Sequence, residues 1–399
     1  GASQPHSAKP RHRAAFPALL APTRCQASFL LNAPAWPNAP EDFHYTNTLI
    51  HLINGLLLFW LAWLAGRQLP RPAAKPEWLA LTACGLWLVH PLWITTVHLP
   101  VQRMTELAAL FSLAGLVGYL KARAYLARRP RAALAGMSAS LLLGGVLAVL
   151  GKENGALLPV YALALEWVLI QPALGRLDRA WRYWKALFLF LPIMLIVVYL
   201  SKLVLVNPEA VYAGRDFTLS ERLLTQARVL WSYVQLLVLP RTSAISIFGD
   251  DYPISTGWTE PITTLWAVAS WLGVIAAAAI WHKRYPLFAA AVLWFLGGHL
   301  LESTIVPLEL YFEHRNYLPA VGPILFLVVG LAAVQHKTKI NLAYVAGLYG
   351  ALLLWVLSQT ASTWANPFVT AQWAHDTHPL SPRAAQHYSK MLYRAGERW

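Results

Sequence analysis

Long apolar stretches alternate with short basic loops along most of this chain. About ten of these stretches are long enough to cross a bilayer, because a helix needs about 20 apolar residues to span a hydrocarbon core about 30 Å thick. The pattern predicts an all-α polytopic membrane protein. We expect the spans at residues 47–65, 78–98, 104–120, 131–150, 154–171, 185–206, 263–281, 286–305, 317–334 and 341–362.

One further apolar segment, 222–240, is interrupted by Arg222, Gln226 and Arg228. This pattern is typical of an interfacial or re-entrant helix. If the segment does not cross, every basic loop falls on one side of the bilayer, which the positive-inside rule makes cytoplasmic. Both termini and the long loop 207–262 then lie outside. The basic loops are 66–77, 121–131, 172–185, 282–285 and 335–340.

Composition changes this picture little. The net charge is +14, from 32 basic and 18 acidic residues. The cytoplasmic loops hold much of the excess, so we expect the lipid bilayer as a partner and no nucleic acid. Of the two cysteines, Cys84 lies in an apolar stretch, so no disulfide with Cys25 is expected. The chain starts at Gly1 without a signal peptide, and we expect an upstream segment to precede it.

The tail of the chain has a pattern of its own. Ser381 and Pro382 have the order of an N-cap followed by proline, and Gly396 suits a C-terminal cap. The helix predicted between them resembles the first helix of a tetratricopeptide repeat, with an ordinary amphipathic helix as the alternative. The expected domains are an outer loop at 1–46, a transmembrane domain at 47–362 and an outer tail at 363–399.

Polar side chains gather on the expected outer side. His44, Asn47 and His51 are three and four residues apart and share one helix face. Polar residues on one face of an apolar helix point into the bundle or a wet cavity, or they join helices by hydrogen bonds. The cavity-lining residues expected on this side are His44, Asn47, His51, Gln102, Glu106, Lys152, Glu153, Asn154, Asn316 and Tyr317.

Arginines at the outer boundary oppose the positive-inside bias. Arg103 lies in a short outer turn, where it can hold a phosphate bidentately or anchor the helix depth by snorkelling. Arg315 lies in the densest polar cluster, between His314 and Asn316, with aromatic residues around it. A solvated loop does not need those aromatics, so this cluster favours a binding site. In the hairpin at 151–155, Lys152 and Glu153 either serve such a site or neutralise each other.

Two other features have simpler interpretations beside the functional ones. Asp250 and Asp251 form a carboxylate pair that suits a metal or a base, although a turn explains it equally. His90 and Pro91 predict a kink with a satisfied histidine. The sequence contains no P-loop, CxxC pair, HExxH motif or serine nucleophile elbow, and no metal or other cofactor is expected.

Four motifs occur in a recognisable order: FHYTN at 43–47, VQRMTELAALF at 101–111, KEN at 152–154 and EHRNYLPAVG at 313–322. Together they resemble the transmembrane-and-tetratricopeptide-repeat O-mannosyltransferase family, most closely its bacterial members, over about residues 28–399. The resemblance implies a C-type glycosyltransferase fold. Such a protein moves a sugar from a polyprenyl-phosphate carrier to a protein hydroxyl on the outer face. It also implies a bacterial inner-membrane protein with its active face in the periplasm and a protein acceptor presented by the tail.

The chemistry of that reaction suggests roles for some residues. Arg103, Arg315 and His314 are expected to bind the donor phosphate, whose charge grows as the glycosidic bond breaks. The family's catalytic acid belongs to an acidic motif in the first outer loop, and this sequence lacks that motif. The catalytic residue is therefore unassigned, and an inactive relative is one interpretation. The candidate acids are Glu41, Asp42, Asp250 and Glu313.

Three other functions remain as alternatives. An O-antigen ligase or polymerase also uses a lipid-linked glycan, and its product is a glycan rather than a glycoprotein. A transporter is expected to show mid-membrane charges and two matching halves, and the sequence shows few such charges and no internal repeat. A non-enzymatic membrane scaffold fits the missing acidic motif.

Overall fold

The computed structural model describes residues 25–32, 41–69, 74–169, 178–206, 208–338 and 341–396, and this part of the chain is helical without strands. The α-helices are α1 (Glu41–Gly66), α2 (Pro76–Leu88), α3 (Ile94–His98), α4 (Arg103–Arg123), α5 (Pro130–Gly151), α6 (Leu158–Val168), α7 (Asp178–Lys185), α8 (Leu191–Val206), α9 (Pro208–Tyr212), α10 (Leu219–Val238), α11 (Thr263–Trp281), α12 (Pro286–Gly298), α13 (Val321–Thr338), α14 (Leu342–Trp364), α15 (Pro367–Thr377) and α16 (Pro382–Arg394). The short helical turns are η2 (Cys25–Leu31), η4 (Pro91–Trp93), η5 (Pro100–Gln102), η6 (Glu153–Leu157), η8 (Ala186–Phe190), η9 (Thr242–Ala244) and η10 (Glu313–Asn316).

Six helices of the described part are long and apolar enough to cross a membrane, or seven if α2 and α3 form one bent span. These helices indicate an integral membrane protein. Three predicted spans contain shorter helices, namely α6, α12 and α13. For example, α12 ends at Gly298, and residues 299–306 continue as turns that bury His299 and Glu302. The count of ten crossings stays a prediction.

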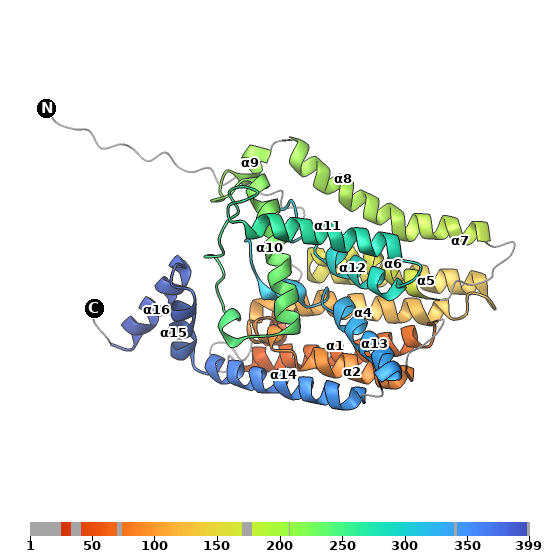
Figure 1. Ribbon diagram of the computed structural model, residues 1–399, viewed down its shortest axis with the longest axis horizontal. Helices are drawn as coiled ribbons and strands as arrows, with labels where there is room; N and C mark the ends of the chain where they lie inside the picture. Colours follow the sequence, from red (N-terminus) through yellow and green to blue (C-terminus); the bar gives the residue numbers. More distant parts are fainter. Residues whose placement is uncertain are drawn as a thin grey trace.

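The long helices lie side by side in one bundle, whereas α10 runs across them near the end that holds α15 and α16 (Figure 1). This orientation agrees with the interfacial position predicted for 222–240. Thr218 and Glu221 form a capping box that starts α10. Arg222 then donates to the backbone oxygens of Glu302 and Thr304, both at 2.7 Å, and so attaches α10 to the turns that follow α12.

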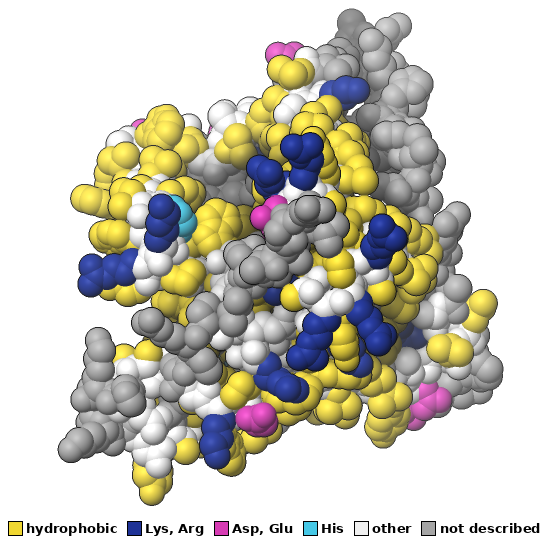
Figure 2. Space-filling view, turned by 90° about the vertical axis from the view of Figure 1, so that its right-hand side faces the viewer, with side chains coloured by type: hydrophobic (Ala, Val, Ile, Leu, Met, Phe, Trp, Pro, Cys, Tyr) yellow, Lys and Arg dark blue, Asp and Glu magenta, His cyan; other side chains and the backbone are white. Residues whose placement is uncertain are grey.

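The opposite end of the bundle is basic. Figure 2 looks onto this end, where Lys and Arg side chains predominate over Asp and Glu among the coloured residues. The turn between α4 and α5 supplies the exposed Arg128, Arg129 and Arg131. Basic side chains therefore gather at this end of the bundle, where the sequence predicts basic loops. Arg71, Arg176 and Lys339, which contribute to the predicted basic loops, lie outside the described residues.

The break between α2 and α3 confirms the predicted kink. The two segments meet at an angle of 49° where His90 precedes Pro91. His90 caps η4 by accepting a hydrogen bond from the Leu92 amide at 3.3 Å, and its other ring nitrogen lies 3.2 Å from the carbonyl oxygen of Leu237. Both nitrogens are thus satisfied, and His90 has a structural role.

The tail helix also begins as predicted. Ser381 accepts a hydrogen bond from the Ala384 amide at 3.0 Å, Pro382 follows it, and Gly396 adopts a positive φ of 81° after the helix. α16 packs against α15, and the side chains of Tyr388 and His375 stack with ring centroids 5.2 Å apart. The structure shows one helical pair here, and the resemblance to a tetratricopeptide repeat stays a prediction.

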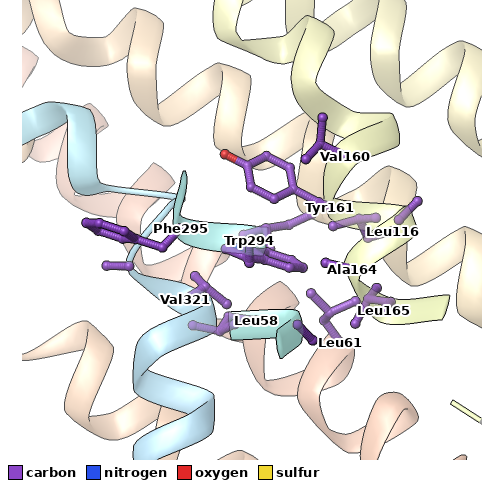
Figure 3. Packing of buried hydrophobic residues seen from close by; sticks show 14 of the residues in the cluster. Leu58, Leu61, Leu116, Val160, Tyr161, Ala164, Leu165, Trp294, Phe295 and Val321 are labelled. Atoms are coloured by element: carbon purple, nitrogen blue, oxygen red, sulfur yellow. The ribbon is translucent and has the colours of Figure 1, made fainter. Parts of the chain in front are cut away.

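The bundle core is continuous between the helices that position the polar clusters. The ring of Trp294 in α12 packs at a tilt against that of Tyr161 in α6, with centroids 4.5 Å apart, and Leu58 and Leu61 of α1 pack nearby (Figure 3). This packing fixes α1, α6 and α12 relative to one another, so polar side chains just beyond it have defined positions.

Candidate functional site

The polar face of α1 is buried as the sequence predicts. His51 Nδ1 lies 2.7 Å from the Tyr317 hydroxyl, and Asn54 donates to the same hydroxyl at 3.2 Å and to the Glu106 backbone oxygen at 3.0 Å. Asn47 donates to the Val97 carbonyl at 3.2 Å. These contacts join α1 to α4 and to the end of η10. The polar face of α1 therefore holds these segments together by hydrogen bonds. His44 is half-buried and stacks on His98 with ring centroids 4.3 Å apart.

Arg103 is fully buried, and its guanidinium donates to protein oxygens. Nε donates to Asn47 Oδ1 at 2.8 Å, Nη1 to the Ser28 carbonyl at 2.9 Å and Nη2 to the Phe43 carbonyl at 3.3 Å. The guanidinium also lies 4.7 Å from the centroid of the Phe29 ring. Arg103 therefore ties η2 to the start of α1. Its predicted contact with a phosphate would have to compete with these bonds.

Close packing of α5 against α4 positions the side chain of Lys152. A Cβ at Gly151 would lie 2.9 Å from the backbone nitrogen of Ala108, so glycine lets α5 approach α4 here. Lys152 then donates to Thr105 Oγ1 at 3.1 Å and pairs with Glu302 at 2.6 Å. Both partners of this ion pair are buried, and neighbouring Glu153 is exposed.

η10 presents Arg315 and His314 to the same region. The Arg315 guanidinium is buried and donates to the carbonyls of Glu309 at 2.7 Å and Leu310 at 3.2 Å. Among the described residues, no carboxylate lies within ion-pairing distance of it. Burial and the nearby Lys152 charge lower the pKa of His314 well below its ordinary value, so the imidazole is neutral at pH 7.

These side chains line one small pocket. Lys152 and Asn154 come from the turn after α5, His314 and Arg315 from η10, and Thr105 from α4. The sequence predicted Lys152 and Asn154 to line a cavity and His314 and Arg315 to bind a phosphate on the same side, and the structure brings these four residues together. Two cations thus face the pocket, and Glu302 pairs with only one of them. The pocket measures about 20 Å³, room for about one water, so an anionic group as large as a phosphate would enter only if the lining side chains moved.

The other candidate acids lie elsewhere. α1 begins at Glu41, earlier than predicted, because acidic residues stabilise a helix N-terminus, so Glu41 and Asp42 lie in its first turn. Asp250 accepts a hydrogen bond from Ser381 at 2.5 Å, and Asp251 lies 2.7 Å from His378 Nδ1. The aspartate pair therefore fastens the tail to the outer loop.

Glu313 is the candidate acid nearest the pocket in sequence, and it is 3% exposed. Burial raises the pKa of its carboxyl to about 7, although the amides of Glu313 and Ser246 oppose this effect. Between pH 4.5 and 7 the folded protein holds a proton that the unfolded chain has released, so stability falls as pH rises through this window. We expect a loss of about 3 kcal/mol from this group.

Thermal melting of the detergent-solubilised protein from pH 4.5 to 8 measures this loss. Glu313→Gln should be less pH-dependent than the parent, because the amide does not titrate. Parallel pH profiles for the two proteins would show that Glu313 titrates normally.

Sequence reasoning missed Glu302, Thr105, Glu166 and Arg123. Glu302 follows His299 by three residues inside an apolar stretch, and an ionisable residue within a predicted span is by itself a functional signal. Glu166 pairs with Arg123 at 2.9 Å, measured from Nη2 to Oε2. The sequence predicted few charged residues within the spans. Glu302, Glu166 and Glu106 are all buried, so the number of buried acids is higher than predicted.

Comparisons with known proteins do not place the chain in a family, since no protein-family model, no curated protein and no solved structure matches it. The described part of the chain has an all-helical fold with several candidate membrane spans. The evidence for a functional site is its geometry alone.

Proposed function

We propose that this protein is a membrane glycosyltransferase that moves a sugar from a polyprenyl-phosphate carrier to a protein hydroxyl on the outer side. The observation that supports the proposal most directly is the buried Arg315 beside a pocket, without a carboxylate partner among the described residues. A buried charge is stable when it is paired, and removal of a partner is strongly unfavourable. An anionic ligand in the pocket would supply that partner.

The charge of the pocket suits one kind of anion. With Glu313 protonated, Lys152 and Arg315 together carry two positive charges, Glu302 offsets one, and His314 is neutral. The remaining single charge matches a phosphodiester, which is the linkage in a polyprenyl-phosphate sugar. An O-antigen ligase would receive a diphosphate with more negative charge, so this balance favours the first function.

In the proposed reaction, Arg315 and Lys152 stabilise the leaving phosphate as the bond to the sugar breaks. The acceptor hydroxyl attacks the anomeric carbon and loses its proton to a carboxylate. Glu313 is the acid best suited to this step, because its pKa of about 7 lets it accept a proton near neutral pH. Asp250 is engaged with Ser381 and fits the role less well.

A transfer assay tests the proposal. The protein in lipid vesicles is supplied with labelled polyprenyl-phosphate mannose and a Ser/Thr-rich polypeptide, and label on the polypeptide is measured. We expect transfer that falls about 10²–10⁴-fold in Glu313→Gln, because a general base is lost. Transfer that survives Glu313→Gln but not Glu41→Gln or Asp42→Asn would move the base to the start of α1. Label that stays on the lipid in every case would contradict the proposal.

A transporter is the second candidate function, and one observation favours it. Glu106 is fully buried within α4, and neither of its carboxylate oxygens has a hydrogen-bond partner among the described residues. Buried carboxyls at membrane depth occur in proton and ion pathways. Movement of the labelled lipid or of ions across the vesicle membrane without transfer to the polypeptide would support this function instead.

A further inference from the structure

A second cavity lies in the membrane-spanning part, and its lining is wholly apolar. It measures about 80 Å³ and lies between α1, α2, α6, α12 and α13. Ala62, Leu79, Ala290, Trp294 and Phe326 are among its lining residues. An apolar cavity of this kind stays dry, so its occupant is apolar.

This cavity is separate from the polar pocket of the proposed enzyme site. Tyr161 lines the polar pocket and Trp294 lines the apolar cavity, and their tilted rings are in contact with centroids 4.5 Å apart. A ligand in the apolar cavity is therefore separate from the proposed function, and only the exclusion of a polyprenyl chain rests on that function.

The cavity lies toward the basic end of the bundle. Gly66 is the last residue of α1, Leu79 lies in the first turns of α2, and Leu287 is the second residue of α12. All three line the cavity, so it reaches toward these ends of the helices, which adjoin the basic loops. In a membrane this depth corresponds to one leaflet only.

Exposed cations stand next to these lining residues. Arg67 follows Gly66 and lies 4.9 Å from the centroid of the Trp63 ring, and Arg284 lies 5.5 Å from that of Tyr285. Lys75 and Lys283 are exposed beside them, and Glu77 is the acid in this group. Cations stacked on aromatic rings at a helix end are placed at the headgroup level of a bilayer.

We propose that the cavity holds part of an acyl chain of an anionic phospholipid from the leaflet at the basic end. Its headgroup is bound by Arg67 and Arg284. Two observations select this occupant: the lining admits only apolar groups, and the exposed residues close in sequence to the lining at this end include four cations and one acid. Attraction between clustered Lys/Arg and anionic lipids is expected at this surface. A polyprenyl chain has its phosphate at the other end of the bundle, beside Lys152 and Arg315, so it does not use these cations.

Native mass spectrometry of the detergent-solubilised protein tests this proposal, with dioleoyl phosphatidylglycerol and dioleoyl phosphatidylcholine as probes. The parent protein should retain one phosphatidylglycerol at least tenfold more tightly than phosphatidylcholine. Ala290→Phe fills the cavity and should weaken this binding about tenfold. Ala276→Phe, the same change at an exposed position on α11, should leave it unchanged.

Two further variants keep the test decisive. Ala291→Leu fills the cavity less severely if the phenylalanine variant does not fold, and Arg67→Gln/Arg284→Gln changes only these two exposed arginines. We expect weaker phosphatidylglycerol binding in both. Equal retention of the two phospholipids would contradict the headgroup site. Retention that the double arginine variant reduces, but neither cavity variant affects, would contradict the acyl-chain site. Displacement of phosphatidylglycerol by an equimolar polyprenyl phosphate would assign the cavity to the donor lipid instead.

Discussion

Replacing Glu302 with alanine is expected to destabilise the protein by about 3–5 kcal/mol, because the change leaves Lys152 buried without its ion-pair partner. The two side chains meet at 2.6 Å, and each is at most 9% exposed. Thr105 would remain as a hydrogen-bond acceptor for Lys152, but it cannot neutralise the charge. The loss should therefore greatly exceed that from an ordinary surface ion pair.

Denaturant unfolding in detergent measures the loss, and two further variants interpret it. Lys152→Met/Glu302→Leu removes both charges and should recover most of the stability, because a hydrophobic pair can replace a buried ion pair. Arg215→Ala breaks a partly exposed pair with Glu309 at 3.3 Å and should cost about 1 kcal/mol or less. If Glu302→Ala were no more harmful than Arg215→Ala, the buried pair would not be a structural element of the site.

Replacing Arg103 with alanine is the second change with a large expected effect. The variant removes the hydrogen bonds that Arg103 donates to Asn47, Ser28 and Phe43, and a hydrogen bond to a charged group contributes about 1.5–3 kcal/mol. We expect a loss of about 3 kcal/mol or more and release of the η2 segment from α1. Limited proteolysis near residues 25–32 reports this release directly.

Arg103→Lys separates the structural role of Arg103 from the phosphate-binding role predicted for it. Lysine keeps the charge but cannot make three directed bonds, so the η2 segment should still become cleavable. A phosphate ligand would behave differently, since Arg103→Lys would weaken donor binding while η2 stays protected. That second result would restore Arg103 to the donor site.

Much of the fold follows from local sequence signals. The span predicted at 263–281 coincides with α11, and α5 and α14 agree with their predictions within about three residues. Single apolar runs bounded by basic loops or by proline are enough to define such helices. The spans predicted around α6 and α12 are longer than these helices. Hydropathy does not show where a helix ends and the chain turns back into the core, as it does near Glu302.

The site was less predictable, because its parts come from distant segments. The sequence marked Lys152, His314 and Arg315 as polar outliers, but their convergence depends on the packing of α4, α5 and η10. Both Arg103 and Arg315 donate to backbone oxygens, and Arg315 also lines the pocket. The partners of Arg103 lie 56 to 75 residues away in the chain, and no local spacing encodes such contacts.

The most direct test of the central claim is equilibrium binding of labelled polyprenyl-phosphate mannose to the purified protein and to Arg315→Lys. Arg383→Lys is the matched control, because Arg383 is half exposed and contacts Glu309 at 2.9 Å outside the pocket. The account predicts saturable binding that Arg315→Lys weakens about tenfold or more, since the guanidinium fork is lost, and that Arg383→Lys leaves unchanged. Equal affinity in all three proteins, with their melting temperatures unchanged, would contradict it.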